Sequence, residues 1–165
     1  KRHFDEQTAR YGSVTCINLA EQGGKEGQIT EAYRQAAEAY GGQVQYVAFD
    51  FHKECAGMKF ENVARLLERM KEEQVLGKMD CFWRTAATSG AGAQTLCKQQ
   101  GAFRVSCLDC LDRTNVVQSA FARHMLGVQL ERLGVAVPSL RGERDEAFDF
   151  AFNDSWANNG DMVSQ

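Results

Sequence analysis

The sequence predicts an α/β domain in which a central mixed or largely parallel sheet is flanked by helices. Runs of strand length, at residues 14–19, 44–51 and 102–106, alternate with runs of helical periodicity at 30–40 and 60–76. The run 44–51 is largely apolar, which is typical of a buried strand. A chain of 165 residues, 44% apolar and 25% charged, suits one globular domain or a large part of one.

The elements of the first half follow one another closely. Residues 2–11 are predicted as a short helix, and the β-rich run from Val14 to Leu19 ends at the glycine turn of residues 22–25. The amphipathic stretch 30–40 ends at Gly41-Gly42. Residues 60–76 place apolar side chains at helical spacing, with Glu and Lys between them.

The second half adds two short strands, a long helix and a less regular segment. Residues 80–84 and 95–98 are predicted as strands around a Ser-Gly-Ala-Gly loop at 89–92. Pro138, the only proline, ends the helical pattern, and residues 137–154 are predicted as a mobile loop.

The most informative segment, residues 104–115, reads Arg-Val-Ser-Cys-Leu-Asp-Cys-Leu-Asp-Arg-Thr-Asn. Cys107 stands six positions before Arg113, and the residues between can curl so that their N–H groups form an anion-binding nest. The guanidinium offers two parallel donors to phosphate oxygens. An apolar-periodic run begins at Val116, so the loop opens onto a helix N-terminus, which also favours an anion. The pattern predicts a cysteine-dependent phosphatase with its site at the carboxyl end of a central strand.

The predicted chemistry needs an ionised thiol and an acid. A helix N-terminus and a neighbouring Arg lower a thiol pKa from about 8.5 to roughly 3.5–7.5, so that Cys107 could attack phosphorus as a thiolate. Either Asp109 or Asp112 could protonate the leaving alkoxide, with Asp112 favoured. Alternatively, both carboxylates merely anchor the loop and the helix start.

Cys110 gives the segment other interpretations. Cys107-x-x-Cys110 before a helix is also a redox pattern, although redox chemistry leaves both aspartates, Arg113 and Thr114 unexplained. No second C-x-x-C and no H-x3–5-H pair is present, so no metal site is expected. Cys110 is then either a small buried residue or a partner that reversibly protects Cys107 as a disulfide.

The twelve residues resemble the signature of Sac-domain phosphoinositide phosphatases, from which they depart only at Ser106, where the family has Asn. Tyr11-Gly12, residues 48–52 and residues 156–161 also resemble family segments. Residues 57–63 and 156–161 look most similar to the inositol 4-phosphatase branch. Because Ser cannot make the two-ended hydrogen bonds of Asn, the departure bears on the geometry of the loop.

The resemblance implies that Cys107 is the nucleophile and Arg113 the phosphate clamp, with no cofactor. It implies a phosphoinositide headgroup at a membrane surface as the partner, most plausibly phosphatidylinositol 4-phosphate. Myotubularin-type phosphatases look similar in the loop alone, which supports a catalytic role for Asp109 or Asp112. The expected substrate-binding residues are Leu108, Cys110, Leu111, Thr114, Asn115, His52 and Lys53. For His52 and Lys53 the alternative is a backbone-bonded strand-end His and a solvent-facing Lys.

Family catalytic domains extend beyond both ends of such a segment, so residues 1–165 are interpreted as the central part of one, with the remaining parts missing from this chain. A net charge of −3 argues against a nucleic-acid partner. Six cysteines without a regular framework suggest a reducing compartment. With no spanning-length apolar run and no signal peptide, the expected location is the cytosolic face of endomembranes, at the endosome, Golgi or ER.

Two other functions stay open from the sequence. A catalytically silent phosphoinositide-binding module would keep the phosphate cradle but lose turnover through Ser106 or truncation. A thiol oxidoreductase would need Cys110 as much as Cys107.

Overall fold

A computed structural model describes residues 1–86, 92–108, 111–143 and 145–164. The chain divides into two compact units, Lys1–Ser106 and Cys107–Gln165. The first unit contains the described strands, and the described part of the second unit is helical.

The first unit is built on a three-stranded parallel sheet. Its strands are β1 (Ser13–Asn18), β2 (Val44–Ala48) and β5 (Gly101–Ser106), in the order β2-β1-β5. Asn18 lies opposite both Ala48 and Ser106, so the carboxyl ends of all three strands meet at one edge of the sheet. This confirms the predicted α/β class. The prediction of a central strand before the Cys107 loop is wrong for the described sheet, because β1 is central and β5 lies at the side.

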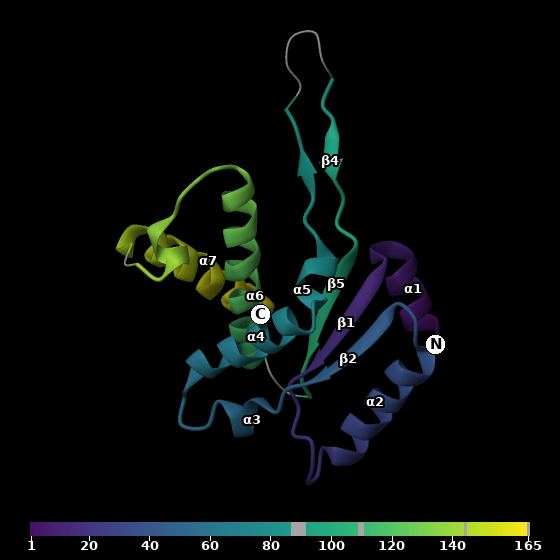
Figure 1. The fold of residues 1–165 in the computed structure, drawn as a ribbon. Coiled ribbons are helices and arrows are strands. Elements are labelled where there is room, and N and C mark those ends of the chain that lie inside the picture. Colours follow the sequence, from purple (N-terminus) through teal and green to yellow (C-terminus); the bar gives the residue numbers. More distant parts are fainter. Residues whose placement is uncertain (87–91, 109–110, 144, 165) are drawn as a thin grey trace. The chain divides into compact units, whose positions relative to one another are not determined.

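Helices cover both faces of this sheet. Figure 1 shows α1 (Arg2–Tyr11) and α2 (Gly27–Tyr40) on one side, and α4 (Val63–Glu72) and α5 (Val75–Met79) on the other. Successive residues of a strand point to opposite faces, so both faces of the central strand β1 can be apolar. The buried cluster on the side of α1 and α2 contains Phe4, Val14, Cys16, Ala37 and Val44.

Two predicted elements differ in the structure: one strand ends early, and one helix is divided into shorter pieces. The strand predicted over 44–51 stops at Ala48, and a short helix, α3 (Phe51–Glu54), follows because the Asp50 carboxylate caps it through the Lys53 N–H. The helix predicted over 60–76 is divided into a 3-10 turn η1 (Phe60–Asn62), α4 and α5. The break lies at Gln74, whose φ of 57° is left-handed and ends the helical ladder.

The remaining strands form a hairpin that extends away from the sheet (Figure 1). Its strands β3 (Trp83–Arg84) and β4 (Thr95–Cys97) are antiparallel, with Trp83 opposite Cys97. They confirm the two predicted strands in a shorter form. Of the predicted loop at 89–92, residues 89–91 lie outside the described residues.

The second unit contains α6 (Leu111–Arg132), a 3-10 turn η2 (Pro138–Arg141) and α7 (Glu146–Ser164). The structure therefore differs from the loop predicted over 137–154. The Asp145 carboxylate caps α7 by accepting the Phe148 N–H at 3.1 Å. The rings of Phe148 and Phe152 stack at 6.3 Å, and the Arg123 guanidinium of α6 lies over both. These contacts give α7 a packed side that the sequence pattern did not reveal.

Candidate active site

The strand, cysteine and helix that the motif predicts follow one another in the structure. Strand β5 ends at Ser106, Cys107 comes next, and α6 begins at Leu111. Asp112 and Arg113 therefore stand in the first turn of a 22-residue helix, where unpaired N–H groups and the helix dipole favour an anion. The helix starts inside the segment that was predicted as loop. The predicted acid Asp109 and the predicted binding residue Cys110 lie outside the described residues.

The exposure of these side chains differs along the segment. Leu108 and Asp112 are exposed, whereas Cys107, Arg113 and Thr114 are half-buried. A half-buried guanidinium at a helix start is restrained by its surroundings and still open to a ligand on one side. Asp112 is open to solvent in the first turn of α6.

The oxidation state of the cysteines separates Cys107 from the others. The Cys107 sulfur is disulfide-bonded in the structure, whereas Cys16, Cys55, Cys81 and Cys97 are not in disulfides. Burial raises the pKa of the Cys16 thiol, and burial with two nearby glutamates raises the pKa of the Cys55 thiol. These two thiols are thus poor nucleophiles at neutral pH, while Cys107 must be reduced before it can act as one.

Asn115, the last residue of the motif, is held by α7. Its Nδ2 donates to the Trp156 carbonyl at 3.0 Å, and its Oδ1 accepts from Asn159 Nδ2 at 2.9 Å. A Cβ added at Gly160 would lie 3.1 Å from the Asn115 amide nitrogen, so the Asn115 side chain would have to shift slightly to accommodate it. The sequence singled out residues 156–161 only by resemblance. In the structure, Trp156 and Asn159 hold the Asn115 side chain through these two hydrogen bonds and so connect the start of α6 to α7.

Arg104, the first residue of the motif, is held within the first unit. Its Nη1 donates to the Tyr33 hydroxyl at 2.8 Å, its Nε contacts His3 Nε2 at 3.1 Å, and its guanidinium lies over the Tyr33 ring. Cys16 lies opposite Arg104 in the sheet register. Burial and the neighbouring Cys16 raise the pKa of Tyr33 to about 12. Arg104 thus fixes the strand that leads to Cys107.

Ser106 stands where the family signature has Asn. Its carbonyl accepts the Leu19 N–H at 2.8 Å, which ties the end of β5 to the residue after β1. Its Oγ is buried without a hydrogen bond of good geometry among the described residues, although it lies close enough to Tyr33 to lower the pKa of that hydroxyl slightly. An unpaired buried hydroxyl is unfavourable, so the serine at this position costs stability that a hydrogen-bonded side chain would not.

His52 and Lys53 lie at the carboxyl edge of the sheet, on the short helix α3. Both side chains are exposed. The Asp50 carboxylate before them accepts the Lys53 N–H at 3.0 Å and the Gln22 N–H at 3.3 Å. These residues belong to the first unit, whereas Cys107 and Arg113 belong to the second, so the structure does not by itself join the two sets.

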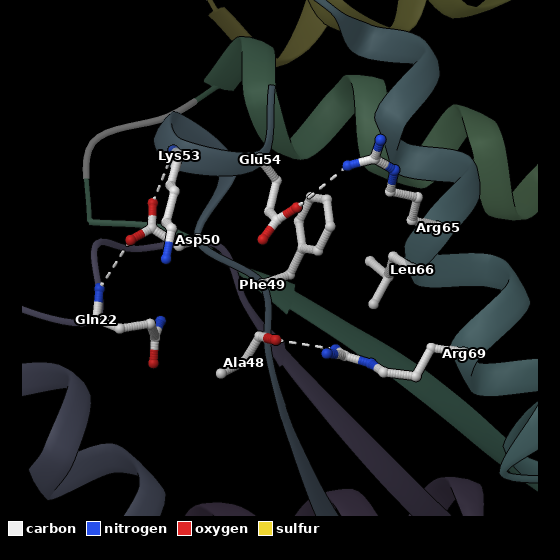
Figure 2. Close-up of a pocket in the computed structure, with 9 residues that line it drawn as sticks. All are labelled: Gln22, Ala48, Phe49, Asp50, Lys53, Glu54, Arg65, Leu66 and Arg69. Atoms are coloured by element: carbon white, nitrogen blue, oxygen red, sulfur yellow. Dashed lines mark hydrogen bonds and ion pairs between the residues drawn. The ribbon is translucent and has the colours of Figure 1, made fainter. Parts of the chain in front are cut away.

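A pocket of about 360 Å³ opens beside Lys53 (Figure 2). Residues of α4 form another side of it, among them Arg65 and Arg69. Neither arginine stands out in the sequence, since both fit the solvated face of an amphipathic helix. The lining residues are Gln22, Ala48, Phe49, Asp50, Lys53, Glu54, Arg65, Leu66 and Arg69.

Within the described ranges, no three His, Cys, Asp or Glu side chains come close enough together to hold a metal ion. No described helix combines the length and the hydropathy needed to cross a bilayer.

Comparison with known proteins places this geometry in a family. Residues 1–56 match the model of the SacI homology domain. The chain is 42% identical over 166 residues to phosphatidylinositide phosphatase SAC2 of Homo sapiens, covering 99% of the chain and 14% of that protein. It is 38% identical over 166 residues to phosphatidylinositol-3-phosphatase SAC1-B of Danio rerio, covering 100% of the chain and 27% of that protein.

A more distant relative agrees with these matches. Phosphatidylinositol-3-phosphatase SAC1 of Saccharomyces cerevisiae is 34% identical over 165 residues, covering 99% of the chain and 26% of that protein. The chain thus spans between 14% and 27% of the length of these relatives. With identity along nearly all of its residues, the chain belongs to the Sac-domain family of phosphoinositide phosphatases.

Proposed function

We propose that this chain carries the catalytic cysteine of a phosphoinositide phosphatase that hydrolyses an inositol-ring monophosphate ester. The observation that carries the proposal is the position of Cys107, between a parallel strand and a helix whose first turn holds Arg113. The names of the relatives support this substrate class, because they are phosphatidylinositide and phosphatidylinositol phosphatases.

The proposed reaction starts from reduced Cys107. Its thiolate attacks phosphorus, the P–O bond to the inositol ring breaks, and the leaving alkoxide takes a proton from Asp112 or Asp109. A phospho-cysteine forms; water then gives a proton to the same aspartate and attacks the phosphorus, and the S–P bond breaks to release inorganic phosphate and restore the thiolate. Arg113 and the N–H groups at the start of α6 stabilise the negative charge that develops on the equatorial oxygens. Leu108, Cys110, Leu111, Thr114 and Asn115 complete the proposed cradle.

Phosphatidylinositol 4-phosphate is the proposed substrate, by resemblance of residues 57–63 and 156–161 to the 4-phosphatase branch. Two of the relatives carry the name phosphatidylinositol-3-phosphatase, so the 3-phosphate is the natural competitor in an assay. The proposed place of action is the cytosolic face of an endomembrane such as the endosome, with His52 and Lys53 contacting the headgroup. The reaction as written uses no cofactor.

Two observations favour the rival functions. The unpaired hydroxyl of Ser106 favours a silent phosphoinositide-binding module, because the loop lacks the side-chain amide that the family signature has at this position. The disulfide at Cys107 favours a thiol oxidoreductase. The three functions predict different effects of Cys107→Ser and Cys110→Ala on phosphate release and on disulfide exchange.

The test is release of inorganic phosphate from phosphatidylinositol 4-phosphate and 3-phosphate in detergent micelles, with a thiol reductant present. Cys107→Ser is expected to abolish release, Cys97→Ser is the matched control at a cysteine that is not in a disulfide, and Cys110→Ala is expected to retain much of the activity. Lipid binding without release in the wild type would establish the silent module. Equal loss of disulfide-exchange activity in Cys107→Ser and Cys110→Ala would establish the oxidoreductase.

A further inference from the structure

We propose that the pocket between α3 and α4 binds a phosphate dianion distinct from the one that Cys107 attacks. The proposal deepens the proposed function, on which it rests for the source of the ligand. The pocket belongs wholly to the first unit and lies at the carboxyl edge of the sheet, where Ala48 ends β2. Open parallel sheets bind ligands at this edge.

The charges around the pocket do not cancel. Five charged side chains line it: two carboxylates, Asp50 and Glu54, and three cations, Lys53, Arg65 and Arg69. The Asp50 carboxylate is occupied by two backbone donors, the N–H groups of Lys53 and Gln22. Its position is therefore fixed by the cap of α3, and it is turned to the backbone.

The second carboxylate has a cation of its own. Glu54 Oε2 lies 3.9 Å from Arg65 Nη1, and Figure 2 shows this pair on one side of the pocket. The pair neutralises itself, and its long separation and exposure make it weak. Arg65 is accordingly a secondary contributor.

Lys53 and Arg69 are then the two lining cations that form no ion pair with the described residues, while Asp50 keeps its negative charge and the five lining charges sum to +1. The Lys53 ammonium makes no hydrogen bond or ion pair with the described residues, and the Arg69 guanidinium uses one N–H on a neutral acceptor, the Ala48 carbonyl, at 2.9 Å. In Figure 2 the two side chains reach the pocket from opposite sides, Lys53 from α3 and Arg69 from α4. Two cations on opposite walls suit a phosphate monoester, which takes an ammonium as a point charge and a guanidinium as a fork.

The walls between these cations are apolar and fixed. Phe49 and Leu66 are buried, with 5% and 1% of their surface exposed. Apolar walls exclude water and strengthen the attraction between a bound anion and the two cations. A pocket of about 360 Å³ is of the size that holds small ligands and is larger than one phosphate requires. The space suits a phosphorylated sugar ring as well as the free ion.

The edge of the sheet relates this pocket to the rest of the chain. Ala48 and Ser106 lie on either side of Asn18 in the register, and Cys107 follows Ser106 in sequence. A lipid headgroup bound at Lys53 and Arg69 through its ring monoester would be a different molecule from the one hydrolysed at Cys107. The ligand is thus either the ring monoester of a second headgroup molecule or free phosphate, and both offer the same dianion.

The test uses the 165-residue chain with Arg113→Met, which disables the proposed cradle at α6 and leaves the pocket intact. Inorganic phosphate and glycerophosphoinositol 4-phosphate are titrated while amide chemical shifts are followed at Gln22, Lys53 and Arg69. Saturable shifts at these amides are expected, and Lys53→Met should weaken binding about three- to tenfold. Lys59→Met is the matched control, because Lys59 is an exposed lysine nearby that does not line the pocket, and it should leave binding unchanged.

A second pair of variants guards against loss of folding. Arg69→Met should weaken binding, and Arg69→Lys should restore part of it, because the charge returns while the fork does not. Tighter binding of the glycerophosphoinositol ligand than of inorganic phosphate identifies the headgroup as the source, and equal binding identifies free phosphate. Both results support the pocket.

The proposal is overturned if the pocket amides do not shift, or if Lys53→Met and Lys59→Met bind phosphate equally. Its failure can be told apart from failure of the proposed function. A chain that binds phosphate in the pocket but releases none from lipid loses the phosphatase proposal and keeps this one. A chain that releases phosphate from lipid with pocket amides unmoved does the reverse.

Discussion

The two units of the chain bury their side chains differently. In the first unit the sheet strands place Val14, Cys16 and Ile17 almost completely out of solvent, whereas among the described residues of the second unit only Val117 and Phe121 of the apolar side chains are buried. The titrating groups differ as well. Burial raises the pKa values of Cys16 and Tyr33 in the first unit, and hydrogen bonds lower the pKa of Asp149 in the second. The first unit is thus stabilised by apolar burial and the second by polar contacts between helices.

Ile17→Ala should have the largest effect, because Ile17 is fully buried in the central strand. We expect a loss of about 2–5 kcal/mol in the free energy of unfolding, from lost burial and from the cavity left behind. Phe150→Ala, at a side chain that is 73% exposed on α7, should change it by less than about 0.5 kcal/mol. Urea unfolding followed by circular dichroism measures both, and similar losses in the two variants would remove the contrast between the units.

Alkaline pH should weaken the first unit through Tyr33. The pKa of this hydroxyl rises from 10.0 to about 12 on folding, so its contribution is complete below pH 10 and is lost as the pH rises toward about 12. The loss amounts to at most about 3 kcal/mol, less because the ring is only partly buried, and the raised pKa of Cys16 acts in the same direction. Urea midpoints compared between neutral and alkaline pH measure it. Tyr33→Phe should lower stability at neutral pH, because the Arg104 bond is lost, yet flatten the alkaline decline; an unchanged decline would contradict the assignment.

Asn115→Ala should loosen the second unit selectively. It removes two hydrogen bonds between α6 and α7, worth about 1–2 kcal/mol together. Amide hydrogen exchange should accelerate in α7 and remain unchanged in β1 and β2. Asn158→Ala is the matched control, because the Asn158 amide donates only to the exposed Asp154 carboxylate one turn away among the described residues. Equal acceleration in both variants would show that the Asn115 contacts contribute nothing.

Acid should have the smallest effect, and it should fall on the second unit. The Ser139 hydroxyl, and then Arg123, hold the pKa of Asp149 below its usual 3.8. The contribution is therefore complete above pH 3.8 and is lost as the pH falls through the lowered pKa. Trp156 fluorescence in a Trp83→Phe background reports the second unit. Asp149→Asn should flatten the acid response, and Asp154→Asn, with no such partners in the described structure, should leave it unchanged.

The sequence predicted the parallel sheet because runs of strand length alternate with runs of helical periodicity; of these strands, β1 is buried along Val14–Asn18, whereas Gln45 of β2 is exposed. It did not predict the break at Gln74, because nothing in the run 60–76 marks a left-handed residue before the chain is packed. It also did not predict α7. That helix depends on contacts of Phe148 and Phe152 with Arg123, which lies more than 20 residues away, and periodicity within one segment carries no such information.

The candidate site likewise has a part that one continuous segment reveals and a part that depends on contacts between distant segments. Cys107 to Asn115 could be identified because the proposed chemistry lies in one continuous segment at fixed spacing. The pocket could not, because Lys53 and Arg69 come together only when α4 packs near the end of β2. The contact of Asn115 with Trp156 joins residues 41 positions apart, and the resemblance gave the second segment without its partner.

The bonded state of the Cys107 sulfur has a practical consequence for enzymology. Under the proposed reaction, material handled in air begins an assay without its nucleophile, so product should accumulate only after a lag that shortens as more dithiothreitol is added. Material kept reduced throughout should start at full speed. Rates from different preparations become comparable only when each is divided by its titrated content of free thiol at this position.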